Sequence, residues 1–475
     1  MKGERKAVAR KSYEMDLCSG GLAGKLLLFS LPLMLSSLLQ LLFNAADIIV
    51  VGRFVGKEAL AAVGSNGSLI NLMVNLFAGL SIGANVVIAR DIGAHRGEKE
   101  ISRSVHTTMT LALWGGLAMM VVGFLFARQF LIWMASPTEV IDLATVYLKI
   151  YYLGMPANFV YNFGAAVLRA EGDTQRPLAY LTGAGVVNVL LNLFLVIVCR
   201  MGVAGVAIAT IAAQYISAIL VVRCLMREQN ALRLHLDRLR MEWPVVKRIM
   251  EVGLPAGFQG ILFALSNVVI QSSLNSFNDP VIVAGSAASS NVEGFVYMAM
   301  NTFHQSAITF VGQNYGAGQC KRVDRVAVLC LSFAAITGVL LGNLAYFNGE
   351  LLLGIYAPGE PEVVAQGLIR MLWICVPYFV CGLMDTMVGV LRGLGYSVFP
   401  MAASLVGVCG LRLLWVALVF PLHRTPSCLY VSYLVTWIVT GLCHTAFFLA
   451  VRKKAYAQVT HQGPSYLRAE GVHPE

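Results

Sequence analysis

Long uninterrupted apolar runs follow one another along almost all of this 475-residue chain, and they limit its possible fold more than any other feature. A run of about 18 or more apolar residues is long enough to cross a bilayer as a helix. Only 13% of the residues are charged, against roughly 25% in soluble proteins. The runs are continuous and do not alternate between apolar and polar residues, which excludes a transmembrane β-barrel. The sequence therefore predicts an all-α polytopic membrane protein.

Twelve transmembrane helices are predicted, six in each half of the chain. Their ranges are 26–51, 59–89, 104–127, 141–168, 178–199, 203–224, 247–275, 281–311, 326–347, 362–391, 398–420 and 428–451. With this division, most of the 35 Lys and Arg residues lie in the tails, the central linker and the loops on their side. Since Lys and Arg accumulate on the cytoplasmic side, both termini are predicted to be cytoplasmic. The net charge of +10 then reflects topology, and a nucleic-acid site is the weaker alternative.

The chain also repeats itself, and one constant offset relates the two copies. The repeated motifs are "SLPLML" and "VGLPAG" at Pro32 and Pro255, "RDIGAH" and "QNYGAG" at Gly93 and Gly316, and "LRAEGDTQRP" and "LRGLGYSVFP" at Arg169 and Arg392. One offset shared by three separate motifs indicates a duplication. Because each half has an even number of spans, both halves enter the membrane from the same side and form parallel repeats.

Five segments follow from these assignments. They are an N-terminal tail (1–25), a six-helix bundle (26–226), a cytoplasmic linker (227–246), a second six-helix bundle (247–452) and a C-terminal tail (453–475) that we expect to be disordered. No cleavable signal is expected before the first span. The ten cysteines include no CxxC motif and lie mostly in apolar runs, so neither a metal site nor a disulfide framework is predicted.

At family level the sequence resembles the multidrug and toxic compound extrusion (MATE) transporters, and it is most similar to their DinF-like bacterial branch. The motifs that carry the resemblance are "DIIVVGRFVGKEALAAVG" after the first span, "LRAEGDTQRP" and "LRGLGYSVFP". The resemblance implies a V-shaped twelve-helix antiporter in the bacterial inner membrane. It also implies that a monomer exports small organic, often cationic, compounds in exchange for H⁺ or Na⁺, with no other cofactor.

An aspartate, Asp47, lies within the first apolar run. A carboxylate at the centre of a bilayer costs about 3 kcal/mol on insertion scales, so such residues are usually retained for pairing or transport. Asp47 shares a helical stripe with Ser36, Gln40 and Asn44. A structural carboxylate and an ion carrier both fit this pattern. The resemblance favours the carrier, because Asp47 and Pro32 match the first-span aspartate and the bend-forming proline of the branch.

The fifth predicted span contains "NVLLN", with Asn188 and Asn192 one helical turn apart. The resemblance implies an Asn-x-x-x-Asp pair here, so this chain departs from the pattern at Asn192. An amide can coordinate a cation through its carbonyl oxygen, but it cannot titrate. A proton relay with two carboxylates in this half is therefore in doubt.

The second half has polar groups of its own. Glu293, Tyr297 and His304 fall on one face of the eighth predicted span, Asp385 lies in the tenth and Arg412 in the eleventh. An arginine deep in a bilayer needs a partner. By depth we expect Arg412 to pair with Glu293, or secondarily with Asp385. A buried ion pair that only stabilises the fold is the alternative to a functional site.

Two other functions compete with the antiporter. A lipid-linked saccharide flippase of the same superfamily is expected to line its cleft with several basic residues, but only Lys149, Arg370 and Arg412 lie within predicted spans away from the span ends. A polytopic membrane enzyme needs clustered catalytic groups, whereas His304 and His444 are isolated. The leading prediction is a secondary antiporter that works by alternating access and is not an enzyme.

Overall fold

The computed structural model describes residues 15–134, 136 and 138–462, and this part of the chain is all-helical. The first half contains α1 (Leu22–Phe54), α2 (Lys57–Gly93), α3 (Glu98–Trp133), α4 (Ile141–Leu153), α5 (Met155–Glu171), α6 (Gln175–Leu193), a π-helical turn η1 (Phe194–Val198) and α7 (Gly202–Met226). A short 3₁₀ turn, η2 (Leu236–Arg238), lies in the linker between the two halves.

The second half has more interruptions than the first. It contains α8 (Trp243–Asn275), α9 (Pro280–Gly316), α10 (Cys320–Phe347), α11 (Gly349–Tyr356), α12 (Pro361–Ile374), α13 (Tyr378–Gly393), α14 (Val398–Ser404), α15 (Leu411–Leu414) and α16 (Pro426–Gln462), with π-helical turns η3 (Leu405–Gly410) and η4 (Trp415–Val419) flanking α15. Local sequence sets the ends of several helices. The Asp279 side chain accepts a hydrogen bond from the Val281 amide at 2.9 Å and caps α9, and Gly172 ends α5 in a left-handed conformation with φ of 104°.

All twelve predicted spans fall on helical segments, but most of these helices extend several residues beyond the predicted ends. The longest extension is that of α16, which continues to Gln462, so residues 453–462 of the tail that was expected to be disordered are helical, and the rest of that tail lies outside the described residues. Nine helices of the described residues are long and apolar enough to cross a membrane, and α12 with α13, bent by 47°, forms a tenth. The two remaining ranges coincide with the α4–α5 pair, which is interrupted at Gly154, and with α9. More than half of the 37 residues of α9 are buried against other helices, so this helix does not need an apolar surface.

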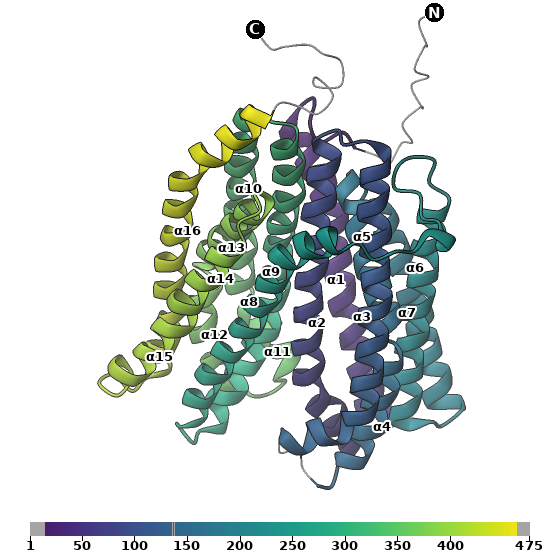
Figure 1. The fold of residues 1–475 in the computed structure, drawn as a ribbon. Coiled ribbons are helices and arrows are strands. Elements are labelled where there is room, and N and C mark those ends of the chain that lie inside the picture. The colour runs from purple at the N-terminus through teal and green to yellow at the C-terminus, as the bar shows by residue number, and fades with distance from the viewer. Residues whose placement is uncertain (1–14, 135, 137, 463–475) are drawn as a thin grey trace, which may run out of the picture.

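The helices form two lobes, as Figure 1 shows: α1–α7 gather on one side of the molecule and α8–α16 on the other. Each lobe has an apolar core of its own, around Leu148 and Phe163 in the first and around Met300 and Met371 in the second. Both ends of the described chain lie at the same end of the bundle, which we call the terminal end. The segment between α7 and α8 comprises residues 227–242, so the predicted linker, 227–246, was four residues too long, and its last four residues belong to α8.

The two lobes contact each other most extensively where α2 crosses α8. A Cβ built on Gly79 would lie 2.1 Å from the backbone nitrogen of Gly257, and one on Gly83 would lie 2.3 Å from the carbonyl oxygen of Ile249. No real Cβ approaches another atom so closely, so the two backbones touch directly. Small residues allow such close helix approach in membrane proteins, where apolar burial contributes little to helix association.

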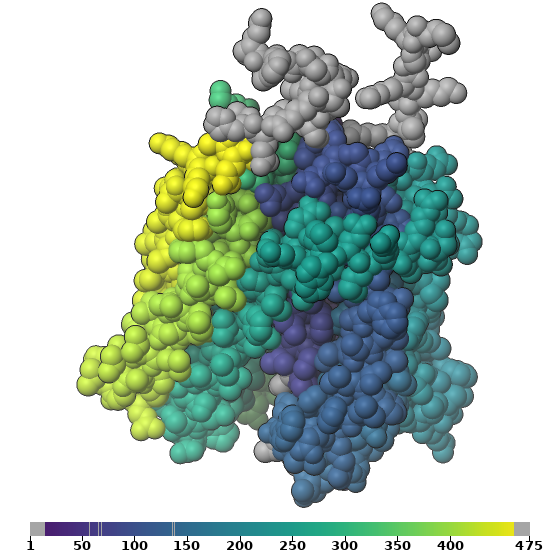
Figure 2. Space-filling view, viewed as in Figure 1, coloured from purple at the N-terminus to yellow at the C-terminus, as the bar shows by residue number. Residues whose placement is uncertain are grey.

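A second contact joins α2 to α9 at the terminal end, and it follows the internal repeat. A Cβ on Gly93 would meet the carbonyl oxygen of Gln313 at 1.9 Å, and one on Gly316 would meet that of Arg90 at 2.3 Å. Gly316 and Gln313 are the repeat equivalents of Gly93 and Arg90. The two helices therefore interlock symmetrically. Away from the terminal end the surface is hollowed between the lobes, with the purple N-terminal helices at the bottom of the hollow (Figure 2).

Candidate functional site

Asp47 lies at the centre of a polar cluster in the first lobe, where α1 meets α6 and α7. Its side chain is 9% exposed. One carboxylate oxygen accepts a hydrogen bond from the Asn192 amide, and the other accepts one from the Thr210 hydroxyl at 3.2 Å. The Asn192 amide also donates to Asn188 Oδ1 at 3.3 Å. The structure thus brings together Asp47, Asn188 and Asn192, which the sequence had singled out separately.

Two features of local structure position this cluster. Gly185 on α6 faces the ring of Phe43, and a Cβ there would lie 1.9 Å from the ring, so only glycine allows α1 to approach this closely. Two residues after Asn192, α6 passes into the π-helical turn η1. Such turns are rare and are frequently found at functional sites.

The other members of the predicted stripe lie outside the cluster. Gln40 and Asn44 are exposed, and a coupling role for them stays a prediction. The Ser36 hydroxyl donates a hydrogen bond to the carbonyl oxygen of Pro32 at 2.9 Å. Pro32 is buried inside α1, which continues through it from Leu22 to Phe54. Proline has no amide hydrogen, so one backbone bond of α1 is missing at this position.

Sequence reasoning missed Thr210, which contributes a hydroxyl to the cluster from α7. The sequence feature that could have identified Thr210 is a lone hydroxyl in the apolar stretch "VAIATIAA" of the sixth predicted span. A threonine in a helix commonly bonds its own backbone, and Thr210 does so with the Val206 carbonyl at 3.0 Å. Only the packing of α7 against α1 shows that the same hydroxyl reaches Asp47.

The predicted pairing of Arg412 with Glu293 is wrong. Glu293 pairs with Arg370 of α12: Nε lies 2.8 Å from Oε1 and Nη2 lies 2.9 Å from Oε2, a bidentate arrangement. Ser286 and Ser289 complete the hydrogen bonding of this buried pair, each at 2.9 Å. Helix rise predicts only depth in the membrane, so it could not tell that α12, and not the eleventh span, packs on this face of α9.

Arg412 does not pair with Asp385 either, and no carboxylate of the described residues forms an ion pair with it. Its Nη1 donates to Ser266 Oγ at 3.1 Å and to Asn267 Oδ1 at 3.2 Å. The guanidinium lies over the ring of Tyr433, 3.9 Å from the centroid. Neutral oxygens and an aromatic face therefore take the place of the expected carboxylate.

Asp385 belongs to a different set of contacts. Its Oδ2 accepts hydrogen bonds from the Tyr297 hydroxyl at 3.1 Å and from the Asn301 amide at 3.0 Å. His304 Nδ1 lies 2.7 Å from the Asp385 carbonyl oxygen, and its Nε2 lies 3.3 Å from Arg392. The structure thus brings Asp385, Tyr297 and His304 together and separates them from the Glu293–Arg370 pair.

Asp385 and Arg412 both line one cavity of about 330 Å³. Its wall also contains Asn75 of α2, so the cavity lies where the two lobes meet. Aromatic rings make up much of the remaining lining: Phe263, Tyr297, Tyr378, Tyr433 and Trp437. Binding sites for small molecules combine apolar and aromatic walls with a few polar groups in this way, and they usually measure about 300–1,000 Å³. Within the described residues, no three His, Cys, Asp or Glu side chains are grouped to hold a metal ion.

Comparison with known proteins agrees with this architecture. The MatE family model matches residues 32–194 and 255–418, two stretches that begin at the repeated prolines Pro32 and Pro255. The protein named "Probable multidrug resistance protein YpnP" from Bacillus subtilis (strain 168) is 27% identical over 408 residues, which cover 86% of this chain and 90% of that protein. The "FAD transporter" of Shewanella oneidensis is 24% identical over 411 residues, covering 85% and 88%.

Among solved structures, one described as the outward-facing conformation of a multidrug resistance MATE family transporter superposes with a TM-score of 0.85. It covers 94% of this chain and 99% of that chain at 18% sequence identity, so it supports the fold. The family model matches more than half of the chain, and both repeats of this all-helical membrane protein fall within the match. This chain therefore belongs to the MatE family of membrane transporters and is not an enzyme.

Proposed function

We propose that Asp47 binds the coupling ion, H⁺ or Na⁺, that drives export. The observation that carries this proposal is a buried carboxylate held between α1, α6 and α7 by neutral donors. Both of its oxygens accept hydrogen bonds, from Asn192 and Thr210. The carbonyl oxygen Oδ1 of Asn192 is buried beside it and accepts no hydrogen bond from the described part of the chain.

This arrangement supports either ion. The carboxylate of Asp47 can take up a proton, and the oxygens of Asp47, Asn188 and Asn192 are the hard ligands that a sodium ion prefers. In either case the ion neutralises the carboxylate charge of the cluster. Loss of that charge weakens the bonds from α6 and α7 to α1, and we infer that α1 then bends at Pro32, where one backbone bond is already missing.

We also propose that the organic substrate occupies the cavity of about 330 Å³ where the two lobes meet. Its aromatic walls suit planar organic molecules, and the Asp385 carboxylate suits a cationic group. Because Asn75 of α2 contributes to the wall, movement of one lobe against the other would change the shape of the cavity. Arg412 at the same cavity suits substrates that also carry an acceptor oxygen.

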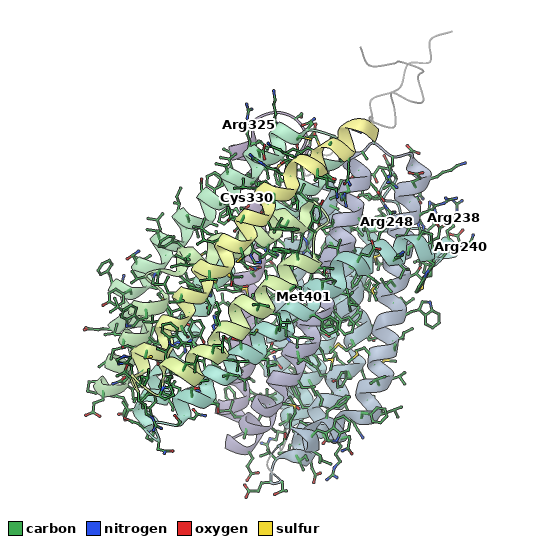
Figure 3. The ribbon with its side chains drawn as sticks, turned by 60° about the vertical axis from the view of Figure 1, so that its left-hand side comes forward. Arg238, Arg240, Arg248, Arg325, Cys330 and Met401 are labelled. Carbon is green, nitrogen blue, oxygen red and sulfur yellow. The ribbon has the colours of Figure 1, made fainter. Side chains whose placement is uncertain are left out.

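We assign the chain to the DinF-like branch and place it as a monomer in the bacterial inner membrane with both termini in the cytoplasm. The motifs around Pro32 and Asp47 support the branch, and the distribution of Lys and Arg supports the orientation. Arg238, Arg240, Arg248 and Arg325 all lie toward the terminal end, as Figure 3 shows. With this orientation the lobes are closed on the cytoplasmic side and the hollow faces outward.

The test is transport of a fluorescent organic cation by the purified protein in proteoliposomes, driven by a pH gradient or a sodium gradient. Asp47→Asn should abolish gradient-driven transport and leave substrate binding intact, because an amide replaces a carboxylate at almost equal volume. Asp142→Asn is the matched control, since Asp142 is exposed and pairs with Arg128 on the surface. Transport by Asp47→Asn at the wild-type rate under both gradients would refute the assignment.

A further inference from the structure

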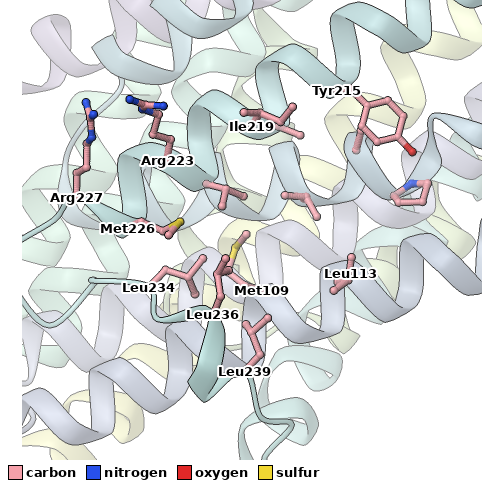
Figure 4. Close-up of a pocket in the computed structure, with 15 residues that line it drawn as sticks. Met109, Leu113, Tyr215, Ile219, Arg223, Met226, Arg227, Leu234, Leu236 and Leu239 are labelled. Atoms are coloured by element: carbon pink, nitrogen blue, oxygen red, sulfur yellow. The ribbon is translucent and has the colours of Figure 1, made fainter.

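A second and larger cavity, of about 690 Å³, lies on the outside of the first lobe. It is a groove between α3, α5 and α7, and the linker that follows α7 closes one side (Figure 4). Its lining is almost entirely aliphatic and includes Ile219 and Val222 of α7 and Leu236 and Leu239 of the linker. Several of these side chains are open to the surroundings, with Ile219 61% and Leu236 52% exposed.

Two arginines lie at one end of this groove. Arg223 and Arg227 are four residues apart on α7 and its C-terminal end, so they share one face of the helix. Figure 4 shows both side chains at the same end, with Tyr215 at the opposite end. Both arginines are exposed, and neither forms an ion pair with a carboxylate of the described residues. The nearby carboxylate of Glu228 is bonded to Arg176 instead.

The groove has the dimensions of one membrane leaflet. Tyr215 and Arg227 are twelve residues apart, which corresponds to about 18 Å along a helix axis. Half of a hydrocarbon core of about 30 Å is about 15 Å. An aliphatic channel of this length with two cationic groups at the interfacial end complements a molecule that has an acyl chain and an anionic head.

We propose that this groove binds an anionic phospholipid. One acyl chain lies along Ile219 and Val222, and the phosphate lies between Arg223 and Arg227. Arginine suits this role because its planar guanidinium donates two parallel hydrogen bonds to phosphate oxygens. The positive charge of Arg223 and Arg227 favours an anionic ligand. The long aliphatic wall favours a lipid over a soluble phosphate, because only a lipid has an acyl chain to cover it.

A bound lipid would also connect the linker to the first lobe. The linker already contacts α3, since the His235 amide donates to His106 Nε2 at 3.0 Å and the Thr107 hydroxyl donates to the Arg240 carbonyl at 3.3 Å. Leu236 and Leu239 of the linker line one wall of the groove. An acyl chain would fill the space between these leucines and α7, and would hold the linker in place.

The experiment uses native mass spectrometry of the full-length purified protein. It compares the binding of phosphatidylglycerol with that of phosphatidylcholine of identical acyl chains. The wild type should retain phosphatidylglycerol preferentially. The double variant Arg223→Gln/Arg227→Gln should lose about tenfold or more of that preference, because each basic residue near the surface contributes to anionic lipid binding. Arg238→Gln/Arg240→Gln is the matched control, with the same change of charge in the exposed linker but outside the groove.

Thermal unfolding provides the second measurement. Phosphatidylglycerol should raise the melting temperature of the wild type and of the control variant, and should do so much less for Arg223→Gln/Arg227→Gln. Inorganic phosphate should have no such effect. The proposal is overturned if both double variants lose lipid equally, if neither does, or if inorganic phosphate protects as well as the lipid. None of these outcomes depends on the role of Asp47.

Discussion

The hydroxyl oxygens of Ser30 on α1 and Ser306 on α9 lie 2.7 Å apart, so a hydrogen bond joins the two lobes. Their repeat equivalents are Gly253 and Gly83, which face each other where α8 crosses α2. A Cβ on Gly83 would lie 2.8 Å from the Gly253 nitrogen. The duplication therefore produces two equivalent helix crossings. At the α1–α9 crossing a pair of serine hydroxyls meets, and at the α2–α8 crossing a pair of glycines meets.

The glycine copy of this crossing should not tolerate a methyl group. Gly83→Ala would place its Cβ 2.3 Å from the Ile249 carbonyl oxygen, and we expect it to destabilise the lobe contact by about 1–3 kcal/mol. Gly64→Ala on the same helix is the control, because no atom lies within 4 Å of its Cβ and alanine is the better helix former. Thermal unfolding in detergent measures both variants. If Gly83→Ala and Gly64→Ala had equal melting temperatures, α2 and α8 would not touch as described.

The Glu293–Arg370 pair should behave as a buried ion pair. Glu293→Gln leaves the arginine charge uncompensated and should cost about 3–5 kcal/mol of stability. Arg370→Met in the same background should restore part of the loss, whereas Arg412→Met should not. The measurement is a double-mutant cycle on the melting temperature. Restoration by Arg412→Met, or additive losses for Glu293 and Arg370, would contradict this pairing.

Thr210 should support ion coupling through its hydroxyl. Thr210→Val keeps the β-branched shape but removes the donor to Asp47, and we expect gradient-driven transport to fall about tenfold, since a hydrogen bond to a charged group contributes about 1.5–3 kcal/mol. Thr210→Ser should restore it. Thr182→Val is the control, because the Thr182 hydroxyl bonds the Leu178 carbonyl of its own helix. A wild-type rate for Thr210→Val would show that the hydroxyl has no part in coupling.

Asp385 should distinguish substrates by charge. Asp385→Asn should weaken binding of a cationic aromatic compound about tenfold or more and should change binding of a neutral analogue little, because only the cation loses a charge partner. Asp324→Asn serves as control, since Asp324 pairs with Arg452 on another face of the second lobe. Fluorescence titration measures both affinities. An equal loss for the cation and the neutral analogue would indicate a structural role for Asp385.

The orientation can be tested by cysteine labelling in intact cells, after the native cysteines have been replaced. A cysteine at Asn278, in the turn between α8 and α9, should react with a reagent that cannot cross the membrane. A cysteine at Arg240, in the exposed linker, should react only after the cells are permeabilised. Labelling of the linker position from outside would reverse the assigned topology.

Much of the fold follows from patterns that are local in the sequence. Long continuous apolar runs must become helices, since only helices and closed β-barrels satisfy the backbone hydrogen bonds in lipid, and barrel strands would alternate between apolar and polar residues. The internal repeat showed that Gly93 and Gly316 are equivalent. The position of Asp47 within an apolar run identified it as a candidate structural or ion-binding carboxylate. The fifth-span pair of Asn188 and Asn192 was found by its spacing of one helical turn. None of these inferences requires knowing which helices are neighbours.

The tertiary structure alone decided which side chains meet. Glu293 and Arg370 are 77 residues apart in sequence, and Asp47 and Thr210 are 163 apart, so no periodicity connects them. Helix rise predicts depth in the membrane, but depth is shared by every helix at that level. That is why Arg412 was given the wrong partner. The partner of a buried charge is set by which helix faces pack together, and glycines such as Gly185 and Gly257 set that packing through contacts between distant segments.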